Sequence, residues 1–291
     1  MVNRKAAIIL CLVIVISVVA LAWLMQLFPW QRPDTLPHQM HAQLTGEEAL
    51  NDTTAVDVSG TDLGIVVKHN GVYRYIFGDT FGVGQFMVTN WRSNTMAYSE
   101  DTKASDGIML KGWIRDPLSG QAKELISSLK KDNIEMTCIP TTAVSLGGKL
   151  YIYYMSVRHW HPVPGRWDCN NASIAVSTND GQTFTKISNI SWPGESKFIQ
   201  FGLAQDSRLQ AVGSYLYLLA TPSGRFNSSY LCRIQPSEIL NQLAYGYYSG
   251  KDTAGNPIWT SDYTKAKEII PAPVGELSVM WNSYLQKWTV F

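Results

Sequence analysis

The sequence is poor in charge and in recognisable cofactor motifs. Charged residues make up 16% of the 291 residues, and the formal net charge is +1. No stretch is strongly basic, so the composition argues against a nucleic-acid-binding protein. The chain lacks a Gly-rich phosphate loop, a Ser nucleophile elbow and zinc-finger spacing. We therefore expect no cofactor and no metal ion.

Cysteines are few as well. The chain has four, of which Cys11 falls in an apolar N-terminal run. Cys138, Cys169 and Cys232 permit one disulfide and leave one thiol over. Of the three pairings, we favour Cys138 with Cys169.

Long apolar runs are absent except at the N-terminus. Residues 6–28 carry no charge and are long enough to cross ~30 Å of hydrocarbon as a helix. Basic residues just before this run predict a cytoplasmic tail over 1–5 and an extracytoplasmic remainder. The alternative is a signal peptide cleaved near Ala22, after which the protein would be secreted. A polar, Pro-containing linker is expected over 29–54.

Helical periodicity is also scarce beyond the linker. Only residues 121–131 predict a short helix, with 237–243 as a weaker candidate. Elsewhere the pattern alternates, and four segments combine a strand, a tight turn and an aromatic-rich strand. They are 62–79 around Asn70-Gly71, 141–156 around Gly147-Gly148, 207–221 around Gly213-Ser214, and 276–291 around Ser283-Tyr284.

These turns recur about every 70 residues, a spacing that is typical of propeller blades with long loops. Residues 177–184 (STNDGQTF) resemble the Asp-box of sialidase-like propellers, and we expect them to form a structural hairpin turn. We predict an all-β propeller over 55–291. Its last hairpin stops at Phe291, so either the first residues of the domain complete that blade or the chain is a fragment, which we favour.

The first hairpin brings two carboxylates together. Pairing about Asn70-Gly71 places Val66 opposite Tyr75 and Asp62 opposite Asp79. Like charges facing each other across two strands are destabilising, which a purely structural hairpin would avoid. Glycoside hydrolysis requires such a pair, with one carboxyl protonated and the other ionised. The alternative is that each Asp caps a turn.

Short motifs are spread from about residue 55 to the end: GTDLG (60–64), YIFGDTFG (75–82), WRSN (91–94), IPT (139–141), LYIYYMSV (150–157), TPSGR (221–225) and GELSV (275–279). In combination they resemble the endo-D-arabinanase family, which is glycoside hydrolase family 183 and was formerly domain of unknown function 4185. The resemblance implies a five-bladed propeller that cleaves D-arabinofuranose polymers of the actinobacterial envelope with inversion. It also implies that Asp79 is the acid and Asp62 the base.

Further residues are candidates for substrate binding. Trp91, Arg92 and Asn94 follow the acid-bearing loop, where polar groups would bond sugar hydroxyls, although a rim position is an equal alternative for Arg92. Glu276 is either a third acid or a structural cap. Trp160 would stack on a sugar ring. The neighbouring His159 and His161 have metal-ligand spacing, but no further ligands complete a site.

Together these features predict a single-pass membrane protein whose extracytoplasmic β-propeller hydrolyses an arabinan such as arabinogalactan or lipoarabinomannan. Its partners would be this polysaccharide and the membrane. A carbohydrate-binding propeller without catalysis is the main alternative, and a sialidase-like enzyme is the third.

Overall fold

The computed structural model describes residues 42–85, 87–205 and 215–291. The expected membrane segment 6–28 and the turn at Gly213-Ser214 lie outside the described residues. Within the ranges that are described, no helix is both long and apolar enough to cross a membrane.

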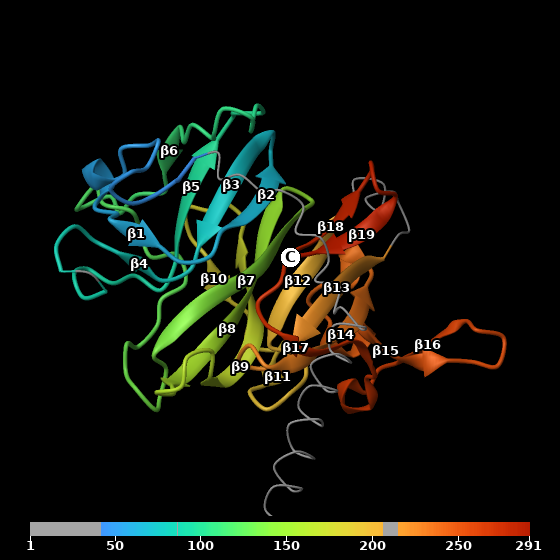
Figure 1. The fold of residues 1–291 in the computed structure, drawn as a ribbon. Helices are drawn as coiled ribbons and strands as arrows, with labels where there is room; N and C mark the ends of the chain where they lie inside the picture. The colour runs from blue at the N-terminus through green and yellow to red at the C-terminus, as the bar shows by residue number, and fades with distance from the viewer. Residues whose placement is uncertain (1–41, 86, 206–214) are drawn as a thin grey trace, which may run out of the picture. The chain divides into compact units, whose positions relative to one another are not determined.

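Three antiparallel four-stranded meanders follow one another along the chain (Figure 1). The first contains β2 (Ile65–His69), β3 (Val72–Phe77), β5 (Thr95–Ser99) and β6 (Gly112–Trp113). The second contains β7 (Thr137–Leu146), β8 (Lys149–Trp160), β9 (Trp167–Ser177) and β10 (Thr185–Lys186). The third contains β12 (Gln200–Gln205), β13 (Leu216–Thr221), β14 (Asn227–Ile234) and β15 (Gly246–Lys251).

Shorter strands extend these sheets. β11 (Trp192–Pro193) pairs with β9, β16 (Pro257–Thr260) with β15, and β17 (Glu268–Val274) with β14. β1 (Gly60–Thr61) pairs with β4 (Thr80–Phe81), next to the first meander. A last hairpin joins β18 (Val279–Asn282) to β19 (Lys287–Val290).

The first strands of successive sheets lie side by side. β7 contacts both β2 and β12, and β12 pairs in parallel with β18. The first strands thus form a row in chain order, and an antiparallel meander leads outward from each of them. Propeller blades have this arrangement. The predicted all-β, propeller-type architecture is thus confirmed, whereas the count of five blades stays a prediction.

Apolar side chains fill the spaces between neighbouring sheets. Ile76 and Met96 of the first sheet meet Ile152 and Ala175 of the second. Between the second and third sheets, the buried Trp192 indole contacts the rings of Tyr153 and Phe201. The polar atoms of buried aromatic side chains form hydrogen bonds with one another in this core. One example is the 2.8 Å hydrogen bond from Trp192 Nε1 to the Tyr247 hydroxyl. Face-to-face packing of twisted sheets therefore supplies the core.

The hairpin turns follow the local sequence. Asn70 and Gly71 have φ of 48° and 84°, and Gly147 and Gly148 have φ of 55° and 73°, as a two-residue turn with two left-handed positions requires. Val66 faces Tyr75, as predicted. The β18–β19 hairpin is also confirmed, with its turn over 283–286. In the third hairpin the first strand begins at Gln200 rather than at residue 207.

The helix predicted over 121–131 is wrong. Leu125 and Ile126 are buried as an apolar stripe would require, but their backbone N–H groups donate to the side chain of Asn94. This distant amide holds the segment in an irregular conformation instead of a helix. The weaker candidate at 237–243 contains two short 3-10 turns, η3 (Pro236–Glu238) and η4 (Gln242–Ala244).

The favoured Cys138–Cys169 disulfide is absent, because the three described cysteines are free. Cys138 on β7 faces Ser156 on β8, and Cys169 on β9 faces Val157 on β8. The two cysteines therefore flank the same strand, about 10 Å apart. A disulfide needs Cα atoms closer than about 7 Å.

Part of the expected linker packs on the first sheet. The Asn51 side chain, which is 8% exposed, accepts from Leu110 N–H and donates to Ile108 O. Leu44 packs against the Tyr75 and Phe77 cluster. Residues 42–54 thus belong to the folded unit.

Candidate active site

The candidate residues gather at one end of the sheets. β2, β7, β12 and β18 begin at this end, and their neighbours β3, β8 and β13 return to it. The loops there carry Asp62, Asp79, Arg225 and Glu276, and Trp160 is the last residue of β8. The alternating strand direction of the propeller therefore collects residues that lie far apart in the sequence.

Asp62 and Asp79 face each other beyond the end of the β2–β3 hairpin. Asp62 N–H donates to Asp79 O at 2.8 Å, and Gly78 N–H donates to Asp62 O at 2.8 Å. Their neighbours Thr61 and Thr80 pair on β1 and β4. The predicted pairing of the two aspartates is confirmed by these backbone contacts.

Asp79 is held by two donors on one oxygen. Its Oδ1 accepts hydrogen bonds from Trp91 Nε1 at 2.8 Å and from Thr137 Oγ1 at 2.6 Å. Burial raises the pKa of Asp79 above its ordinary value, and the nearby Asp62 charge adds to this. Burial and the Asp62 charge together outweigh the two hydrogen bonds and the Lys130 charge, which lower the pKa of Asp79. Because both donors occupy Oδ1, a proton on this carboxyl resides on Oδ2.

Asp62 has a different environment. It is exposed, and its Oδ1 accepts from Leu63 N–H at 2.9 Å. Leu63 has φ of 60°, a left-handed conformation that is uncommon for a bulky residue and that concentrates at functional sites. A pocket of about 410 Å³ opens beside it, between Thr61, Leu63 and the ring of Phe77.

Arg225 links three loops around Asp62. Its Nε donates to Glu276 Oε2 at 2.7 Å, and its backbone N–H donates to Gly165 O at 3.0 Å. The hydrogen bond to Glu276, together with the Glu276 and Asp62 charges, raises the pKa of Arg225. Arg225 was not among the predicted site residues, although it ends the TPSGR motif, because its approach depends on loops that are distant in sequence.

Two aromatic residues of the predicted set also reach this end. Trp91 is partly buried and stacks on Phe81 with ring centroids 6.3 Å apart while it donates to Asp79. Trp160 is partly buried against the core and meets Trp167 edge to face at 5.4 Å. The Arg225 guanidinium lies 5.7 Å from the Trp167 ring, which connects this aromatic pair to the Asp62 side of the site.

Arg92 and Asn94 are buried and therefore not available to a substrate, contrary to the expectation from their position after Asp79. Arg92 is 6% exposed, and its guanidinium donates to Ala122 O and Asp57 O. Asn94 is fully buried, and its amide makes four hydrogen bonds to backbone groups. This number exhausts its donors and acceptors. Both residues therefore hold the 121–131 segment against the first sheet.

His159 near the end of β8 and His161 in the β8–β9 loop are each paired with an acid. His159 Nδ1 lies 2.7 Å from Asp132 Oδ1, and His161 Nε2 lies 3.2 Å from Asp168 Oδ1. In the part of the chain that the structure describes, no group of three or more potential metal ligands is present.

Comparison with known proteins places the chain in a family. Residues 48–291 match the family model described as "Domain of unknown function (DUF4185)". The chain belongs to this family. No match to this DUF4185 chain is found among the curated proteins.

Solved structures with a similar fold include a candidate hydrolase from Bacteroides ovatus, with 14% identity and a TM-score of 0.53 over 78% of this chain. The match covers 62% of that protein, so the DUF4185 chain spans about three fifths of its length. At this identity the likeness concerns the fold alone.

More distant matches include an α-L-arabinofuranosidase from Clostridium thermocellum and an arabinanase from Bacillus subtilis. The first has 12% identity and a TM-score of 0.38, with 79% of this chain and 80% of that chain covered. The second has 13% identity and a TM-score of 0.38, with 78% and 64% covered.

Proposed function

We propose that this protein is a membrane-anchored, extracytoplasmic glycoside hydrolase that cleaves D-arabinofuranose linkages of cell-envelope arabinan. Asp79 is the general acid and Asp62 the general base. One observation above others supports it: a partly buried carboxyl of raised pKa faces an exposed carboxylate across a hairpin end. The choice of arabinan is supported by the resemblance of the motifs around both residues to endo-D-arabinanases.

The chemistry divides between the two carboxyls. Asp79 donates the proton on Oδ2 to the glycosidic oxygen while the bond from this oxygen to the anomeric carbon breaks. Asp62 accepts a proton from a water molecule that attacks the same carbon from the opposite face, with inversion of configuration. The raised pKa of Asp79 supports this division, since it helps that carboxyl to keep the proton that a general acid must donate.

Arg225, Glu276 and the Trp160–Trp167 pair provide the substrate side. Arg225 supplies N–H donors and Glu276 supplies carboxylate acceptors for sugar hydroxyls beside Asp62. The indole rings provide apolar faces for the sugar ring. These residues come from the second and third sheets and from the segment before β18, so a bound polysaccharide would cross several blades.

Incubation of the purified full-length protein with arabinogalactan and with lipoarabinomannan tests the function. We expect soluble arabino-oligosaccharides, and a sialoside should remain intact. The Asp79→Asn variant should still bind the polysaccharide but release nothing. Binding by the unmodified protein without any release would overturn the enzyme and favour a carbohydrate-binding propeller.

The anchor and the stereochemistry need separate measurements. A protein held by residues 6–28 stays with the membrane fraction after a carbonate wash, whereas cleavage near Ala22 frees it into the medium. Proton NMR of the first-formed reducing ends reports the anomer. Formation of the retained anomer would contradict the role of Asp62 as a base.

A further inference from the structure

A lysine–glutamate ion pair lies behind the acid-bearing loop. Lys130 Nζ donates to Glu124 Oε1 at 2.6 Å and also to Ser93 Oγ. The same Glu124 oxygen accepts from Ser93 N–H at 2.7 Å. The two side chains are only 27% and 25% exposed, so solvent screens this pair less than it screens an ion pair on the open surface.

The ammonium group of this pair rests on an indole that binds Asp79. Lys130 Nζ lies 4.6 Å from the centroid of the Trp91 ring, and Trp91 Nε1 donates to Asp79 Oδ1 at 2.8 Å. A cation over the face of an indole is attracted by the ring, and the polarised ring becomes a better N–H donor. The cation and the carboxyl are therefore coupled through one side chain as well as through space.

The backbone at Lys130 indicates that its position is enforced. Its φ is 54°, a left-handed conformation that few non-glycine residues adopt. The next residue, Lys131, closes a turn with its N–H on Glu135 O at 3.0 Å.

We propose that the Lys130–Glu124 pair is a positioning and tuning device, which acts through Trp91 and sets the upper limit of the pH range in which Asp79 is the acid. This inference rests on the proposed function. Neither residue touches the substrate, and each acts through its charge. The Lys130 charge favours the ionised form of Asp79, while the Glu124 charge limits this effect.

Besides Lys130, the charged groups around Asp79 are one carboxylate and two arginines that are bound to other acids. Asp62 lies across the hairpin end and opposes ionisation of Asp79. Arg92 is buried, with Nη1 3.9 Å from Asp57 Oδ2. Arg225 binds Glu276 on the side of Asp62. Lys130 is thus the cation whose charge offsets the burial of Asp79.

Replacing one or the other member of the pair should shift the pKa of Asp79 in opposite directions. Lys130→Met removes the positive charge and leaves Glu124 unbalanced, so Asp79 keeps its proton to higher pH. Glu124→Gln leaves Lys130 unbalanced, so Asp79 loses its proton at lower pH. Each shift should be about half a pH unit, below the range for direct ion pairs. The double variant should lie between the two.

The experiment measures kcat/KM against pH for the full-length protein acting on arabinan. The alkaline limb of the profile should move to higher pH for Lys130→Met and to lower pH for Glu124→Gln. Lys111→Met and Glu100→Gln are matched controls, because these residues form an exposed ion pair of the same 2.6 Å length elsewhere on the first sheet. The controls should leave the limb unmoved. Loss of activity with an unmoved limb in both Lys130 and Glu124 variants, or shifts in the same direction, would overturn the proposal.

A second readout separates this inference from the proposed function. Carbon-13 NMR of labelled aspartate carboxyls follows the titration of Asp79, whose signal is assigned by its loss in Asp79→Asn. The opposite shifts should appear there without any substrate. If the unmodified protein cleaves no arabinan, the proposed function fails, and the NMR titration still decides whether the pair tunes Asp79.

Discussion

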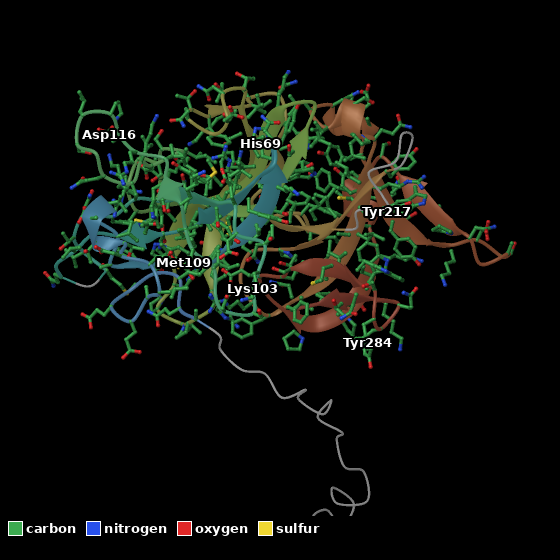
Figure 2. The ribbon with its side chains drawn as sticks, turned by 90° about the horizontal axis from the view of Figure 1, so that it is seen from above. His69, Lys103, Met109, Asp116, Tyr217 and Tyr284 are labelled. Carbon is green, nitrogen blue, oxygen red and sulfur yellow. The ribbon has the colours of Figure 1, made fainter. Side chains whose placement is uncertain are left out.

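The two ends of the sheets treat their polar side chains in different ways. At the end opposite the candidate site, β2 ends at His69, which is labelled in Figure 2. Its side chain is completely buried. Its Nδ1 lies 2.8 Å from Ser145 Oγ and its Nε2 lies 3.0 Å from Asp180 Oδ1. Asn70 also donates to Asp180 at 2.7 Å. These hydrogen bonds join the first and second sheets.

The Asp-box-like segment belongs to this opposite end. Asn179 Oδ1 accepts from Thr183 N–H at 3.0 Å, and Asp180 and Gly181 have φ of 56° and 87°. The expected structural hairpin turn is therefore confirmed. Its polar atoms serve the turn and the contact with β2, and they lie far along the strands from Asp62 and Asp79.

At the candidate-site end, the arrangement of polar groups lowers the stability of the folded state. Asp79 is partly buried with a raised pKa, a second carboxyl faces it at Asp62, and Leu63 has a left-handed backbone. Such conflicts persist where function requires them. The contrast supports the proposal that the polar groups of one end serve stability and those of the other end serve catalysis.

Replacement of one carboxylate at each end should give the largest difference. Asp79→Asn should lower kcat/KM on arabinan by about a thousandfold or more, because the variant has no proton to donate. Asp180→Asn should leave kcat/KM unchanged. Equal losses in the two variants, measured by oligosaccharide release, would break the comparison.

Removal of the buried imidazole should act on stability alone. His69→Leu leaves the Ser145 hydroxyl without its partner and should lower the free energy of unfolding by about 1–3 kcal/mol. Urea denaturation measures this loss. Activity of the folded fraction should be retained, and a catalytic defect without loss of stability would contradict the structural role of His69.

The pH dependence of stability should have opposite signs at the two ends. Burial raises the pKa of Asp79, so the native protein loses stability as the pH rises through that pKa. Asp79→Asn should therefore become more stable than the unmodified protein as the pH rises. Hydrogen bonds from Asn70 and His69 lower the pKa of Asp180. Asp180→Asn should be less stable at neutral pH, with the difference fading in acid. Thermal unfolding at several pH values tests both signs.

The smallest effect should come from Trp91→Phe, which keeps the ring and removes one donor to Asp79. With Thr137 still bonded, kcat/KM should fall several-fold, as expected for one hydrogen bond of about 1 kcal/mol. The pKa of Asp79 should rise, because a donor that favours its ionised form is lost. Ser145→Ala, which removes one bond from His69 at the other end, should leave the pH–rate profile unchanged.

Sequence alone was sufficient where the determinants are local. Asn70-Gly71 and Gly147-Gly148 specify their own turns, and counting outward from Asn70-Gly71 places Asp62 opposite Asp79. The helix predicted over 121–131 is wrong, because the Asn94 side chain accepts hydrogen bonds from the backbone of this segment, about thirty residues further along the chain.

Site residues that depend on packing were harder to predict. Arg92 and Asn94 have suitable chemistry and lie close to Asp79 in sequence, but they point into the interior. Arg225 reaches the site only when the loops after β8 and β13 come together. Lys130 acts through an aromatic ring that no spacing rule connects to it.

In the proposed mechanism, Asp79 donates a proton to the leaving group and Asp62 activates water. The most direct test compares kcat/KM of the Asp79→Asn and Asp62→Asn proteins on an arabino-oligosaccharide with a nitrophenyl leaving group, which needs no protonation. We predict that Asp79→Asn cleaves this substrate far better than arabinan, whereas Asp62→Asn cleaves neither. Equal losses on both substrates for Asp79→Asn would contradict the assignment of Asp79 as the acid.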